Sequence, residues 1–168
     1  MTPLLIVDGY NIIGAWALAE KKQWPFEECR DQLLVRLEEY AAYHGCEAVL
    51  VFDGTKSERK VRSEEHVGNV RVVYTRHGET ADQFIERLCD GQPRYREVRV
   101  ATNDSVEQLV ILGRGATRVP ARELLREMAQ AHTAQRAAIA SGQGKRNPLI
   151  DRLPRHQREA LEKMRRGQ

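Results

Sequence analysis

The sequence predicts an α/β fold built on a mostly parallel central sheet. The chain has 168 residues, and domains usually run to roughly 100–200 residues. Short continuous apolar runs, such as Leu4–Val7 and Ala48–Phe52, are typical of strands buried on both faces. Longer segments with helical periodicity lie between these runs. This alternation favours parallel strands joined by helices.

The elements follow in order along the chain. Strands are predicted over residues 4–7, 48–52, 70–75 and 97–102, with a shorter one over 116–119. Helices are predicted over residues 27–43, 80–90, 104–113, 121–140 and 154–166. Gly45 stands where the first helix should end, and Thr80 with Gln83 forms the pattern of a capping box. Thr55–Asn69 is polar and has no apolar period, which predicts a loop.

The charge distribution divides the chain into an acidic body and a basic tail. The net charge is +3, but residues 145–168 alone carry +5 and the remainder carries −2. We therefore predict one domain over residues 1–140, followed over 141–168 by a linker (Ser141–Pro148) and a basic C-terminal helix. Such a tail suits a polyanionic partner. It could equally fold back on the domain, because Leu149, Leu153 and Leu161 would give it an apolar face.

Composition points to a soluble cytoplasmic protein. Hydrophobic residues make up 41% and charged residues 30% of the chain, and no apolar run approaches the ~20 residues that span a bilayer. Met1 leads almost directly into the first strand, without the pattern of a secretory leader. Cys29, Cys46 and Cys89 are odd in number and widely spaced, which favours reduced thiols over disulfides or a zinc site.

Aspartates stand at or near the ends of several predicted strands. Asp8, Asp53 and Asp104 each follow a strand, and Asp82 lies in the first turn of the helix after the third strand. Ligands of parallel sheets bind beyond the carboxyl ends of the strands, so these carboxylates can converge. An unpaired cluster of carboxylates would repel itself. A hard cation such as Mg²⁺ or Mn²⁺ would make the cluster favourable.

Each aspartate also has a purely structural explanation. Asp53 precedes Gly54 in a common turn sequence. Asp104 could be a helix N-cap, and Asp82 could interact with a helix dipole. Asp8 is the hardest to explain in this way, because Asn11 is placed three residues later, where its amide could orient a carboxylate or a ligand.

Taken in order, these motifs resemble the NYN domain of the PIN-like ribonuclease superfamily, in its bacterial YacP-like branch. The matching residues are Val7–Asn11, Phe52–Gly54, Glu79–Asp82 and Thr102–Ser105. The resemblance implies a PIN-like three-layer α/β/α sandwich with a central mostly parallel sheet. It also implies metal-dependent endonucleolytic cleavage of single-stranded RNA. Branch members look like enzymes that act on messenger RNA in association with the ribosome.

The resulting hypothesis assigns roles to individual residues. Asp8, Asp82 and Asp104 would hold Mg²⁺ or Mn²⁺, with Asp53 beside them, and an activated water would attack the phosphodiester. Asn11, Asn103 and Ser105 would orient the carboxylates or their waters. Tyr10 could stack on a base, although a core tyrosine is an equally good explanation. The candidate residues for the RNA backbone, which could instead belong to a solvated surface, are Lys56, Arg59, Lys60, Arg62 and Arg76.

Two alternatives from other classes remain open. One is a non-catalytic module that binds RNA or the ribosome, and the other is a Mg²⁺-dependent small-molecule phosphohydrolase. In the latter, the nucleophile motif usually has two aspartates one residue apart, whereas here Gly9 and Tyr10 follow Asp8. No dinucleotide or Walker glycine motif is present, so no small organic cofactor is expected, and neither is a membrane partner. Aromatic residues make up only 6% of the chain, which argues against an extended base-stacking surface.

Overall fold

A single sheet organises the computed structural model, which describes residues 1–54, 63–104 and 113–141. Within these ranges the strands are β1 (Leu4–Asp8), β2 (Glu47–Phe52), β3 (Ser63–Val67), β4 (Val70–Tyr74), β5 (Val98–Ala101) and β6 (Thr117–Val119). Their order across the sheet is β3-β4-β2-β1-β5-β6. All neighbours pair in parallel except β3, which runs antiparallel to β4 at one edge.

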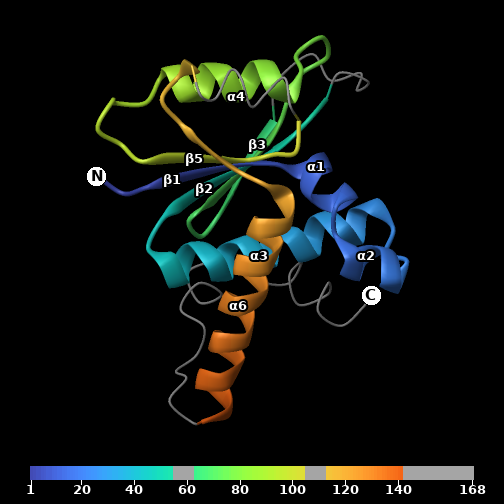
Figure 1. Ribbon diagram of the computed structural model, residues 1–168. Coiled ribbons are helices and arrows are strands. Elements are labelled where there is room, and N and C mark those ends of the chain that lie inside the picture. The colour runs from blue at the N-terminus through green and yellow to red at the C-terminus, as the bar shows by residue number, and fades with distance from the viewer. Residues whose placement is uncertain (55–62, 105–112, 142–168) are drawn as a thin grey trace.

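Helices cover both faces of this sheet, giving three layers (Figure 1). The helices of the described ranges are α1 (Gly9–Gly14), α2 (Ala17–Lys22), α3 (Phe26–His44), α4 (Ala81–Asp90) and α6 (Ala121–Ala140). Of these described helices, Figure 1 shows α4 on one face of the sheet, and α3 and α6 with α1 and α2 on the other. The predicted α/β/α sandwich with a mostly parallel sheet is therefore confirmed.

Two apolar cores explain why the strand sequences are continuously hydrophobic. Successive side chains of a strand point to opposite faces. Accordingly, Leu5 and Val7 of β1 pack in the core shared with α3 and α6, whereas Leu4 and Ile6 pack in the core under α4. All four side chains are buried. Because both faces of β1 are buried, its sequence does not alternate between apolar and polar residues.

Most predicted elements are present with boundaries shifted by one or two residues. The helix predicted over 121–140 is α6 with the same bounds. Gly45 caps α3 in the left-handed conformation with a φ of 63°, and Thr80 and Gln83 form both hydrogen bonds of the capping box on α4. The predictions of a helix over 104–113, a linker and a basic C-terminal helix concern mainly residues outside the described ranges.

The prediction of a loop over residues 55–69 is wrong for residues 63–67, which form β3. Its inner three residues, Glu64–His66, are exposed, so this edge strand lacks the apolar alternation that marks a half-buried strand. A two-residue turn, Gly68-Asn69, joins it to β4, and Gly68 has a φ of 58°. A glycine-asparagine pair between two runs is a hairpin signal. The Gly68-Asn69 pair is therefore the sequence signal that indicates this hairpin.

Further features concern the thiols and the membrane. Cys29, Cys46 and Cys89 are all buried and free, in agreement with the predicted reduced thiols. Of the helices in the described ranges, none has the length and apolar character required to cross a bilayer.

Candidate active site

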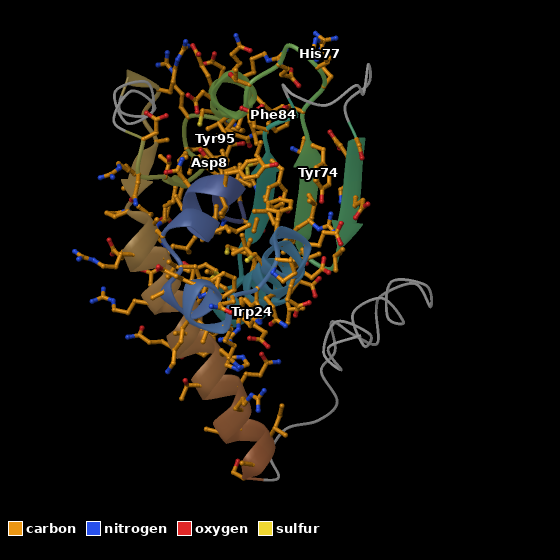
Figure 2. The ribbon with its side chains drawn as sticks, turned by 90° about the vertical axis from the view of Figure 1, so that its right-hand side faces the viewer. Asp8, Trp24, Tyr74, His77, Phe84 and Tyr95 are labelled. Carbon is orange, nitrogen blue, oxygen red and sulfur yellow. The ribbon has the colours of Figure 1, made fainter. Side chains whose placement is uncertain are left out.

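The candidate site lies where the strand order reverses. From β1 the chain moves outward through β2 and β4, and then returns to place β5 on the other side of β1. In parallel sheets such a switch point opens a crevice at the carboxyl ends of its two strands. Here those ends carry Asp8 on β1 and the segment Thr102–Asp104 after β5. Figure 2 looks onto this edge of the sheet and shows Asp8 beside α1.

Asp8 is both the last residue of β1 and the N-cap of α1. Its side chain is buried, with 5% of the residue's surface exposed. One carboxylate oxygen accepts a hydrogen bond from the backbone N–H of Asn11 at 3.5 Å, and the other accepts one from the Asn11 side-chain amide at 3.0 Å. The strand-to-helix transition thus fixes the orientation of this carboxylate.

Asn11 connects the segments that follow the two strands at the switch point. While its amide group donates to Asp8, its Oδ1 accepts a hydrogen bond from the backbone N–H of Asn103 at 3.1 Å. Asn103 in turn accepts a hydrogen bond on its own Oδ1 from the backbone N–H of Ala121 at 2.9 Å. The two asparagines therefore join α1, the end of β5 and the first residue of α6.

Thr102 holds the backbone that carries Asp104. Thr102 is fully buried, and its Oγ1 accepts a hydrogen bond from the backbone N–H of Asp104 at 3.1 Å. The Thr102 carbonyl accepts a second hydrogen bond from Nε of Arg118 on β6 at 3.1 Å. Asp104 is half-buried. It lies three residues after the end of β5, whereas Asp8 is the last residue of β1.

Thr75 holds the backbone next to Asp53 in a similar way. Its buried hydroxyl accepts a hydrogen bond from the backbone N–H of Gly54 at 2.6 Å and donates one to the carbonyl of Glu79 at 2.7 Å. A Cβ on Gly54 would lie 1.7 Å from the Thr75 carbonyl oxygen. Glycine is therefore required by the close approach of the segments that follow β2 and β4, and half-buried Asp53 is positioned next to this junction.

Asp82 comes from the face of the sheet covered by α4. It is the second residue of that helix, half-buried, and lies behind the Thr80 cap. Glu79 immediately precedes the Thr80 cap. Its side chain is buried and forms an ion pair with Arg87, which lies in the last turn of α4. A shallow hollow of about 700 Å³ lies here, lined by Arg76, His77, Gly78, Glu79, Gln83, Glu86 and Arg87.

The donors present are oxygen atoms of carboxylates, which are the ligands that Mg²⁺ and Mn²⁺ prefer. Asp8, Asp53 and Asp104 stand at the carboxyl ends of the adjacent strands β1, β2 and β5. Within residues 1–54, 63–104 and 113–141, no three His, Cys, Asp or Glu side chains form a group that could hold a metal ion. Carboxylate oxygens are therefore the right type of ligand for a hard cation and stand at one edge of the sheet, but the described side chains do not come together as a three-ligand group.

The remaining predicted site residues fall into two sets. Tyr10 is 48% exposed, so the alternative of a core tyrosine does not hold, and Arg76 lines the hollow beside α4. Ser105, Lys56, Arg59, Lys60 and Arg62 lie outside the described residues. The sequence alone predicts no role for Thr75 or for Thr102, although each directly follows an observed strand.

Comparison with known proteins matches residues 5–166 to the YacP-like NYN domain family. The chain belongs to this family. It is 43% identical over 129 residues to the protein YacP of Bacillus subtilis, with 74% of each chain covered. YacP-like NYN domains are of nuclease type, and the match extends over all four aspartates of the candidate site.

Solved structures of a family member have the same fold. A crystal structure of Rae1 (YacP) from B. subtilis matches with a TM-score of 0.71 and 35% identity, covering 99% of this chain and 96% of that one. A tryptophan-to-leucine mutant of the same protein matches with a TM-score of 0.70 and 32% identity, covering 95% and 98%. The predicted membership of the YacP-like branch is therefore confirmed.

Proposed function

We propose that this chain is a metal-dependent endoribonuclease that cleaves single-stranded RNA, with messenger RNA as its cellular substrate. One observation carries the proposal. In a chain of a nuclease-type family, Asp8 and Asp104 stand at the carboxyl ends of the two strands that flank the switch point. A crevice in that position is where α/β proteins bind their ligands.

Mg²⁺ or Mn²⁺ is the proposed cofactor. When bound, such an ion lowers the pKa of a water molecule and neutralises charge on a phosphodiester. Asp8, Asp82 and Asp104 would hold the ion, with Asp53 beside them. Mg²⁺ often uses only one or two carboxylates and completes its shell with water and substrate phosphate. The proposal therefore does not require all the aspartates to contact the ion at once.

The residues around the aspartates would keep them in place. Asn11 restricts the Asp8 carboxylate through the 3.0 Å hydrogen bond from its amide, and Thr102 restricts the backbone of Asp104. Ligands held in this way need little reorganisation when substrate binds, which favours reaction. Ser105 is proposed to assist them.

The RNA backbone is proposed to pass over the α4 side of the site. Arg76 and Arg87 line the hollow there, and cationic side chains contact phosphates without reading sequence. The basic residues Lys56, Arg59, Lys60 and Arg62 are proposed to extend this surface.

The test is cleavage of a labelled single-stranded RNA in Mn²⁺, with EDTA as the metal-free arm. Asp8→Asn and Asp104→Asn should each lower the rate roughly a hundredfold or more, because metal stabilisation of the reaction is worth several kcal/mol. Asparagine also caps helices well, so Asp8→Asn should keep α1 folded. Glu97→Gln is the matched control: Glu97 is exposed at the opposite, amino end of β5, and its loss should leave the rate unchanged.

Other outcomes separate the rival functions. RNA binding without cleavage under any metal condition, with RNA also uncut on ribosomes, would indicate a non-catalytic module. Release of inorganic phosphate from monoesters, with RNA left intact, would indicate a phosphohydrolase. Cleavage that survives both aspartate substitutions would rule out the proposed site.

The ribosome is proposed as a partner in the cytoplasm, on the basis of the family resemblance. Sedimentation of the full chain with translating ribosomes tests this. Replacing Arg155, Arg158 and Arg166 by glutamine should weaken co-sedimentation and flatten its salt dependence, because fewer counterions would be released. Unchanged co-sedimentation would exclude a role for these three arginines.

A further inference from the structure

Four aromatic rings gather at the carboxyl edge of the sheet. Tyr10 of α1 stacks on Phe26, the first residue of α3, with ring centroids 5.1 Å apart and an interplanar angle of 21°. Phe52, at the end of β2, meets both rings edge-on at 5.5 and 5.7 Å. Tyr74, at the end of β4, stacks on Phe52 at 5.5 Å. Figure 2 shows Tyr74 on this edge of the molecule, across from Asp8.

The inner and outer rings of this group differ in exposure. Phe52 is fully buried, whereas Tyr10 and Phe26 are 48% and 39% exposed. A Cβ on Gly9 would lie 2.3 Å from the Phe52 ring, so α1 is seated directly on that ring. The two outer rings are therefore supported from beneath by a rigid core residue while part of their surface remains in water.

The position of this exposed pair ties it to the candidate site. Tyr10 is two residues after Asp8, in the helix that Asp8 caps. Among the described residues the Tyr10 hydroxyl has no hydrogen-bond partner, so its ring contacts alone hold this side chain. Exposed apolar side chains scattered singly are ordinary. A stacked pair at the rim of a candidate phosphodiester site needs a further explanation.

We infer that Tyr10 and Phe26 form a stacking platform for an unpaired RNA base next to the scissile phosphodiester. This inference rests on the proposed function and assigns to Phe26 a part in positioning the substrate. Every base has a π-face, so stacking on aromatic side chains tolerates different sequences. It also requires an unpaired base, which would make the enzyme selective for single strands over duplexes.

Charge around the platform indicates how the strand would lie. Glu27 and Glu28 follow Phe26 in the first turn of α3, and their carboxylates would repel phosphates. The Arg30 side chain, one turn further along α3, reaches the hydroxyl of Tyr74 in the same aromatic group. A neutral base is therefore favoured over a phosphate next to Phe26 itself, and Arg30 is the nearby cation that a flanking phosphate could reach.

Binding, measured apart from cleavage, tests the platform. The probes are fluorescein-labelled oligouridine and the same oligomer with abasic riboses, followed by anisotropy in EDTA at about 50 mM salt, where phosphate contacts are strong. The unmodified protein should bind the base-containing probe more tightly. Tyr10→Ala and Phe26→Ala should weaken that binding about tenfold, within the range for loss of one base stack, and should change abasic binding little.

Conservative variants and a distant control complete the test. Phe26→Tyr should retain affinity, while Phe26→Leu should keep the apolar packing but lose most of the stacking. Tyr43→Ala is the matched control, because Tyr43 is 63% exposed near the opposite end of α3. Its removal should leave both affinities unchanged.

The results distinguish failure of the platform from failure of the proposed function. Wild-type protein that binds both probes equally, or binds neither, would overturn the platform, as would full affinity in Phe26→Leu. If the platform variants lose affinity but Asp8→Asn cleaves normally, the platform stands and the proposed metal site is wrong.

Discussion

Asn11 shows how much one residue can do at this edge of the sheet. A carboxylate only accepts hydrogen bonds and a backbone N–H only donates. The Asn11 amide must therefore point its NH₂ at Asp8 and its oxygen at Asn103, as the structure has it. Neither aspartate nor leucine could satisfy both neighbours. A single side chain thus couples the orientation of the candidate catalytic carboxylate to the end of β5.

Adding a single methyl group at Gly54 should lower the stability of the fold markedly. In Gly54→Ala the new Cβ would meet the Thr75 carbonyl, which is backbone and cannot rotate away. We expect the free energy of unfolding to fall by about 3 kcal/mol, near the upper end for overpacking, as measured by urea denaturation. Gly14→Ala is the control, since nothing lies within 4 Å of its Cβ position. Equal stability of the two variants would contradict the close approach.

At the scale of elements, α4 depends on its N-terminal cap. The Thr80 hydroxyl accepts a hydrogen bond from the backbone N–H of Gln83 at 3.1 Å, and the Gln83 side chain accepts one from the backbone N–H of Thr80 at 3.0 Å. Thr80→Ala should therefore lower the free energy of unfolding by about 1 kcal/mol. It should also slow RNA cleavage, because Asp82 lies in the turn that the cap orders.

Thr133→Ala provides the comparison for the cap. Thr133 is exposed on α6, and its hydroxyl donates only to the Ala129 carbonyl within the same helix. We expect thermal unfolding and cleavage to be unchanged in this variant. A Thr80→Ala protein as stable and active as Thr133→Ala would show that the capping box contributes nothing here.

The sequence predicts those elements whose signals are local. The capping box on α4 and Gly45 after α3 depend on neighbouring residues, and the central strands have apolar runs because both their faces are buried. Edge strand β3 lacks that signal. Helix α1 is only six residues long and begins at a glycine, so its start is set by the Asp8 side chain rather than by propensity.

The candidate site is predictable to a similar degree. Strand-end aspartates can be found from sequence because parallel strands place their carboxyl ends together. The roles of Thr75 and Phe26 cannot, because Thr75 bonds to Gly54 from 21 residues away and Phe26 gains its place by contact with Tyr10 and Phe52. The low aromatic content of the chain does not predict that four of its rings lie together at the carboxyl edge of the sheet.

At the scale of the whole molecule, the α3–α6 layer contains a polar network that ties it to the sheet. Arg99 of β5 donates to the Tyr40 hydroxyl at 2.9 Å and pairs with Glu127 of α6 at 3.2 Å. Tyr40 of α3 in turn donates to Glu127 at 3.0 Å. Burial raises the pKa of Tyr40 to about 12, so this hydroxyl remains a donor at neutral pH. The network joins both helices to β5.

Glu38, in the same layer, should make the stability of the whole fold depend on pH. It is 4% exposed, its Oε1 has no hydrogen-bond partner among the described residues, and burial together with repulsion by Glu39 raises its pKa to about 8. In the unfolded chain this carboxyl has an ordinary pKa near 4.5. The folded state therefore holds the proton more tightly, and Glu38 causes no loss of stability below pH ~4.5. The loss grows as the pH rises towards about 8 and then levels off.

Glu38→Gln should remove this loss, raising the free energy of unfolding at pH 7 by roughly 1–3 kcal/mol and flattening its decline between pH 5 and 8. Urea denaturation across that range measures the effect, with exposed Glu20→Gln as the control. A pH profile identical in the two variants would show that Glu38 is solvated and ionises normally.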